Sequence, residues 1–134
     1  MLFKTLLCAR PAALVVLALS MGTTAAHADI KDYEFQLVEN ETKKGDGIVA
    51  VRLVRKSDGK PVPDAVIFAT RLDMEPDGME TMKTSIEPMP STEPGVYRFK
   101  VNLIMEGGWR LSLGAKVQGE ADSLESRLIF KALP

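Results

Sequence analysis

The sequence has few of the residue types on which most enzyme active sites and metal sites depend. Its 134 residues include one cysteine and one histidine, Cys8 and His27, and aromatic residues make up only 6% of the chain. It also lacks an apolar run of the roughly twenty residues that a membrane-spanning helix needs. These shortages exclude several chemistries and leave few candidates for a functional site.

The N-terminal 28 residues have the three-part pattern of a secretory signal peptide. Lys4 and Arg10 precede a short apolar run over residues 12–19, and the small residues that follow end in Ala26-His27-Ala28. We expect cleavage after Ala28 and a periplasmic or secreted protein. The mature chain, residues 29–134, then forms one domain with no direct membrane insertion.

Cleavage after Ala28 would remove both Cys8 and His27. The mature chain then has no Ser-His or Cys-His pair for nucleophilic catalysis, and no imidazole or thiolate for a zinc or cupric site. Paired carboxylates could support a small hydrolase, but carboxylates in loops and on strand faces are more typical of a solvated surface. We therefore predict that the protein is not an enzyme.

The charge balance of the mature chain gives no reason to expect nucleic acid as a partner. Lys4 and Arg10 belong to the leader, so 15 of the 17 basic residues remain against 18 acidic ones, a net charge of −3. Binding to a phosphate backbone depends on an excess of basic side chains.

Seven segments have the composition and alternation of β-strands, and none of the mature chain has the pattern of a helix. Short strands between turns favour an antiparallel β-sandwich, because each one-sided sheet must cover the other. The third segment is apolar on both faces and predicts a well-covered strand; prolines around the fourth predict an edge strand. The segments are residues 33–38, 48–55, 62–72, 80–86, 97–105, 109–118 and 124–130.

The fifth and sixth segments read as a hairpin with a tight turn at Gly107-Gly108. Alternate residues place one apolar face on each strand, with Trp109 inside and Met105 at the end of the first apolar face. The inward side chains are Tyr97, Phe99, Val101, Leu103, Met105, Trp109, Leu111, Leu113, Ala115 and Val117.

Three methionines, Met74, Met79 and Met82, surround the turn sequence Glu75-Pro76-Asp77-Gly78. Thioether sulfur is a soft ligand that suits Cu(I), so the three are candidate ligands of one ion. Methionine is also a flexible filler of cores and of contact surfaces. By its place on an alternating face Met82 suits the core, whereas the loop position of Met74 and Met79 disfavours burial.

The mature chain resembles the YtkA-like domain family, which is related to the periplasmic part of FixH proteins. The resemblance covers about residues 45–132 and implies a small immunoglobulin-like β-sandwich in the bacterial envelope, in the context of copper handling, heavy-metal efflux or cytochrome oxidase assembly. It lies in Pro63-Asp64-Ala65-Val66, the methionine-rich loop over residues 73–82, Pro94-Gly95-Val96-Tyr97, and residues 105–111.

The resemblance and the methionines together indicate a periplasmic accessory binding module. The first hypothesis is a role in copper or heavy-metal homeostasis, with Cu(I) bound by Met74, Met79 and Met82. The alternative is a metal-free interaction module that docks on a membrane-embedded efflux or oxidase-assembly complex through the same loop.

The first prediction concerns processing. The intact mass of the exported protein should match a chain that begins at Asp29, because the apolar run and Ala26-x-Ala28 direct cleavage there. Mass spectrometry checks this, and a retained N-terminus or a lipid adduct on Cys8 would contradict it.

Overall fold

The computed structural model describes residues 29–134, and the predicted signal peptide, residues 1–28, lies outside them. The described chain contains nine strands and two 3-10 turns, and within it no helix is long and apolar enough to cross a membrane. In chain order the elements are η1 (Ile30–Asp32), β1 (Tyr33–Leu37), β2 (Glu41–Lys43), β3 (Gly45–Arg55), β4 (Val66–Met74), η2 (Glu75–Asp77), β5 (Met79–Thr84), β6 (Ile86–Met89), β7 (Val96–Leu103), β8 (Gly107–Lys116) and β9 (Ser123–Leu133).

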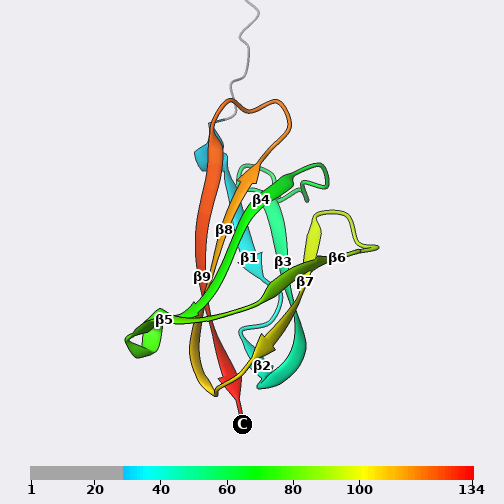
Figure 1. Cartoon of the computed structure of the whole chain (residues 1–134). Helices are drawn as coiled ribbons and strands as arrows, with labels where there is room; N and C mark the ends of the chain where they lie inside the picture. Colours follow the sequence, from blue (N-terminus) through cyan, green and yellow to red (C-terminus); the bar gives the residue numbers. More distant parts are fainter. Residues whose placement is uncertain (1–28) are drawn as a thin grey trace, which may run out of the picture.

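The strands form two sheets that pack as a β-sandwich, which confirms the predicted fold class (Figure 1). One sheet has the order β1-β3-β7-β6, and the other has the order β2-β9-β8-β4-β5. All pairs are antiparallel except β2 with β9, which is parallel. The last strand runs the length of the sandwich, and the C-terminus lies beside β2 at one end (Figure 1).

Alternation along the strands gives each sheet one apolar face, and the two faces form the core. Trp109 and Phe99 are the largest fully buried side chains, with 0% and 1% exposure. Every inward residue predicted for the fifth and sixth segments is buried or partly buried except Met105, which is 39% exposed. The face of Met105 was therefore predicted wrongly.

The predicted hairpin is wrong, although both of its strands exist. β7 pairs with β3 and β6 in one sheet, whereas β8 pairs with β9 and β4 in the other. The chain between them crosses from sheet to sheet, so the two apolar faces cover each other across the core. Met105 lies in this crossing, where its backbone carbonyl accepts a 2.9 Å hydrogen bond from Nε1 of Trp109.

The strand predicted over residues 62–72 begins and ends later in the structure, and one of its faces is exposed to solvent. β4 begins at Val66, after a turn at Pro63 and Asp64, and continues to Met74. Val66 is 64% exposed and Phe68 is 57% exposed, so the expectation of a well-covered strand is wrong. Phe68 is the unpaired residue of a bulge in the β4–β8 register, and its ring lies over Gly114 on the outer face of the sheet.

Two further differences concern the short strands. The polar segment that contains Glu41–Lys43 forms β2, which alternation does not reveal because it has only three residues. The predicted strand over residues 80–86 is two strands, β5 and β6, separated at Ser85 and belonging to different sheets. Each is the outermost strand of its sheet, which confirms the predicted edge position.

The second prediction concerns Trp109. Trp109→Ala should lower the free energy of unfolding by about 3–5 kcal/mol, because it removes a fully buried indole from the core. Urea melts followed by circular dichroism measure the loss. Ile129→Ala is the control, because Ile129 is 53% exposed and should cost well under 1 kcal/mol. Coinciding melts of the wild type and Trp109→Ala would contradict a buried tryptophan.

Candidate functional site

The three predicted methionine ligands lie in or against the core. Met74 ends β4 and is fully buried, so the expectation that its loop position disfavours burial is wrong. Met79 begins β5, and its Cα is the register partner of Met74. Met79 and Met82 are partly buried and pack against the core, as expected for Met82. The structure therefore brings Met74 and Met79 together across a strand pair and places Met82 three residues further along β5.

The turn between Met74 and Met79 is fastened to the β7–β8 crossing. η2 contains Pro76 in its first turn and ends at Gly78, whose φ of 74° lies in the left-handed region that glycine tolerates. The carboxylate of Asp77 accepts a 3.1 Å hydrogen bond from the backbone N–H of Gly108. This bond joins segments 31 residues apart and holds the methionine turn against the end of the sandwich.

Asp73, beside Met74, is the one fully buried charged residue of the described chain. Its carboxylate accepts hydrogen bonds from Nε of Arg71 at 2.7 Å, from Nη2 of Arg110 at 3.0 Å and from the backbone N–H of Glu75 at 3.1 Å. Burial alone would raise the pKa of Asp73, but the two guanidinium groups and the backbone donor outweigh burial and hold the pKa below its ordinary value. This cluster fixes the end of β4 just before the methionine turn.

The side-chain atoms near the three methionines that could act as metal ligands suit a soft ion better than a hard one. Within residues 29–134 no three His, Cys, Asp or Glu side chains converge in a way that could hold a metal ion. The carboxylate of Asp73 already accepts three hydrogen bonds, so its oxygens are engaged within the protein rather than available to a metal ion. Any ion here would depend on thioether sulfur, which fits Cu(I).

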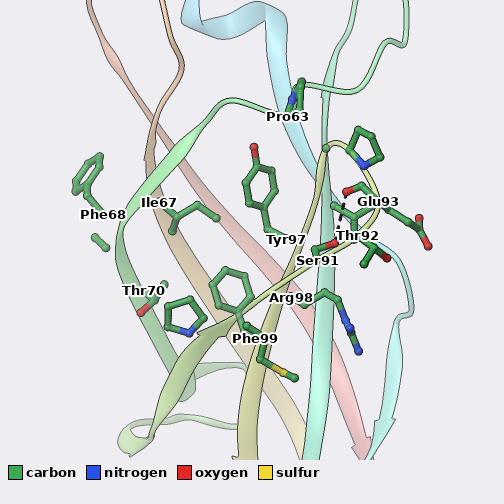
Figure 2. Close-up of a pocket in the computed structure, with 16 residues that line it drawn as sticks. Pro63, Ile67, Phe68, Thr70, Ser91, Thr92, Glu93, Tyr97, Arg98 and Phe99 are labelled. Carbon is green, nitrogen blue, oxygen red and sulfur yellow. Dashed lines mark hydrogen bonds between the residues drawn. The ribbon is translucent and has the colours of Figure 1, made fainter.

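A second candidate site, which we call the β4 groove, lies between β4 and the strands of the opposite sheet (Figure 2). It is an open cavity of about 690 Å³. Figure 2 shows Ile67 of β4 directed towards Tyr97, whereas Phe68 points to the other side of β4. The lining residues are Pro63, residues 67–70, Pro88, Met89 and residues 91–99.

Tyr97 positions one end of the groove. Its hydroxyl donates a 2.8 Å hydrogen bond to the carbonyl of Val62 and accepts a 3.0 Å bond from the backbone N–H of Ala65. Burial raises the pKa of Tyr97, so the phenol stays neutral and keeps its donor at physiological pH. These bonds tie the segment before β4 to β7 in the other sheet and thereby set the entry of β4 into the fold.

The groove was not predicted from the sequence, although the sequence contains a signal for an uncovered strand. Residues 65–69 are apolar on both faces, and this was interpreted as a strand covered on both sides. The structure instead leaves Val66 and Phe68 exposed. An apolar run of this kind indicates either a covered strand or a strand that awaits a partner, and alternation alone does not distinguish the two.

The order of strands defines the class of protein. β1, β3, β7 and β6 follow the order A-B-E-D of an immunoglobulin domain, and β9, β8, β4 and β5 follow G-F-C-C′. The chain is therefore an immunoglobulin-like β-sandwich, in which Trp109 lies on the strand equivalent to F. The YtkA-like family model matches residues 27–114, and the chain belongs to that family. The match begins and ends earlier than the resemblance noted from the motifs.

Three solved structures are similar to the chain, and the first of them, with a TM-score above 0.5, supports the fold. A DUF4426 family protein from Pseudomonas aeruginosa PAO1 is similar with a TM-score of 0.54 and 14% identity, over 76% of this chain and 89% of that one. The Lin-41 filamin domain has a TM-score of 0.45 and 15% identity, over 74% and 91% of the two chains. The ZirS C-terminal domain has a TM-score of 0.47 and 11% identity, over 100% and 88%. No curated protein matches the sequence.

The third prediction concerns the charge of Asp73. Because its pKa is lowered on folding, the carboxylate stabilises the fold above its unfolded pKa of about 3.9, and this contribution is lost as the pH falls through the folded pKa. Asp73→Asn should cost about 3 kcal/mol at pH 7, because it leaves two arginines without their buried partner.

The difference in unfolding free energy between wild type and Asp73→Asn should shrink from pH 7 to pH 3, because below the ordinary pKa of an aspartate the unfolded chain takes up a proton that the folded carboxylate, with its lowered pKa, resists. Urea melts at both pH values measure it. Asp46→Asn is the control, since Asp46 is exposed and should cost little at either pH. A difference that stays constant with pH would show that the charge of Asp73 contributes nothing to stability.

Proposed function

We propose that the protein is a non-enzymatic accessory binding module of the bacterial envelope, which docks on a membrane-embedded complex through the β4 groove. Membership of the YtkA-like family supports an accessory role. The absence of histidine and cysteine from residues 29–134 supports a binding function over catalysis. An efflux or oxidase-assembly complex is the expected partner, and the leader over residues 1–28 would deliver the domain to the periplasm.

One observation carries this proposal: β4 presents apolar side chains on both faces, and one face has no cover. Val66 and Phe68 are the two most exposed large apolar side chains of the described residues. Phe68 also lines the groove, and Val66 lies two residues before it on the same strand. Contiguous apolar surface of this kind on a soluble domain is typical of a contact site.

The fourth prediction tests docking in the envelope. A photo-crosslinking amino acid in place of Phe68 should yield a discrete adduct with an envelope protein, because this exposed side chain stands at the rim of the groove, on the strand that a docked partner would cover. The same amino acid in place of Ile129 is the matched control, since Ile129 has similar exposure on β9 and lies outside the groove. Immunoblotting after irradiation of whole cells detects the adduct. Equal adducts at both positions, or none at Phe68, would contradict docking through the groove.

Cu(I) binding by Met74, Met79 and Met82 is a second candidate function. It is favoured by the register that places Met74 opposite Met79, with Met82 on the same strand. Binding would be internal rather than at a loop tip, because Met74 is fully buried. A bound Cu(I) ion would supply a site for metal transfer, and the three thioethers would hold it.

The fifth prediction separates the two candidates. The triple variant Met74→Leu, Met79→Leu, Met82→Leu keeps apolar volume and removes sulfur, so each change should cost less than about 1.5 kcal/mol in stability. If the site binds Cu(I), the triple variant should lose affinity in an anaerobic competition titration, and Met89→Leu should not. Equal affinity in wild type and triple variant would leave no metal role for these methionines.

A further inference from the structure

The edge of β4 that borders the groove is paired with a neighbouring strand over only part of its length. Over Val66–Asp73, β4 pairs with β8 on one side. On the other side β5 pairs only with Leu72, Asp73 and Met74. β5 then leaves β4, and after Ser85 the chain continues as β6 in the opposite sheet. The position next to Val66–Arg71 therefore has no strand, and the groove occupies that place.

The other sheet edges carry features that discourage pairing with a foreign strand, and this segment does not. β2 has three residues, β1 has five and carries Glu34, β6 contains Pro88, and β5 carries Glu80 and Lys83. Short length, proline and charge are the usual protections of an edge. The β4 segment from Val66 to Thr70 has neither a charged residue nor a proline. An unprotected apolar edge is a template for strand addition.

The shape and chemistry of the groove suit an extended chain. Six residues of strand, Val66–Arg71, span about 20 Å at about 3.4 Å per residue. Ile67 lines one wall, and Phe99 lines the opposite wall. Glu93 and Arg98 are the charged residues of the lining, and Figure 2 shows both side chains directed away from β4. The inner surface is therefore uncharged.

We propose that the β4 groove binds an extended peptide segment of the partner protein by strand addition to Val66–Arg71. The segment continues the line of β5 along β4, and its backbone groups pair with the open edge. Its alternate side chains that face the groove are uncharged, because the lining offers them no counter-charge. This inference rests on the proposed docking function and specifies how the partner is recognised.

A random library of linear twelve-residue peptides displayed on phage is the probe. Selection on the mature protein should enrich peptides with uncharged residues at alternate positions, and synthetic copies should bind in calorimetric titrations. Thr70→Lys directs a charged side chain from the inward face of β4 into the groove, so it should weaken binding at least about tenfold. Thr81→Lys is the matched control, because Thr81 is exposed on β5 and lies outside the groove lining, and it should leave binding unchanged.

Thermal melts confirm that each variant is folded, and Ala69→Glu replaces Thr70→Lys if the latter unfolds, because Ala69 is exposed beside the groove. No enrichment, or peptides that bind the edge variants as tightly as the wild type, would overturn strand addition. The two proposals fail separately. A crosslink at Phe68 without peptide binding would support docking on a partner but overturn strand addition. Peptide binding without a crosslink would support strand addition but overturn docking on a membrane complex.

Discussion

The structure depends on one constraint: the apolar faces of β7 and β8 must be removed from water, and they cover each other. Had the two strands formed a hairpin, both faces would have lain on one side of one sheet and needed a separate layer. The crossing at Met105 places them in opposite sheets instead, with Phe99 and Trp109 in a shared core. The hydrogen bonds from Trp109 to Met105 and from Gly108 to Asp77 fasten that end of the sandwich.

The same separation of strands creates the candidate site. Because the chain changes sheets at Ser85, β5 covers only the last three residues of β4 before β6 joins β7. The buried Asp73, held by Arg71 and Arg110, fixes the paired end of β4. Tyr97 fixes the other end through Val62 and Ala65. Between these two anchors the edge of β4 is open, and the groove lies beside it.

Much of the fold could be predicted from the sequence because alternation reports which side chains face the core. The inward positions of Val49, Val51 and Leu53 on β3 and of Trp109 on β8 follow directly from it. Alternation does not report which strand lies beside which, so the hairpin at Gly107-Gly108 was predicted where the chain crosses between sheets. It is also silent for β2, whose three residues gain their place by pairing with β9.

The candidate site was less accessible to sequence reasoning, for a physical reason. The burial of Met74 depends on a register with Met79 and on the fastening of η2 to Gly108, both of which are long-range or bulged contacts. The exposure of Phe68 depends on a bulge and on the absence of a neighbouring strand. The local composition is the same whether these side chains lie in the core, contact a partner or bind a metal ion. Only the arrangement of the strands distinguishes these three roles.

The edge of β4 is open over Val66–Arg71, and amide hydrogen exchange of the free mature protein measures this most directly. Amides bonded to β8 should be protected, and alternate amides between Val66 and Arg71 should exchange rapidly because they face the groove. Leu72, Asp73 and Met74, paired with β5, should mark where the pattern of rapid exchange ends. Uniform slow exchange from Val66 to Met74 would contradict the account, because it would mean that the edge is already covered.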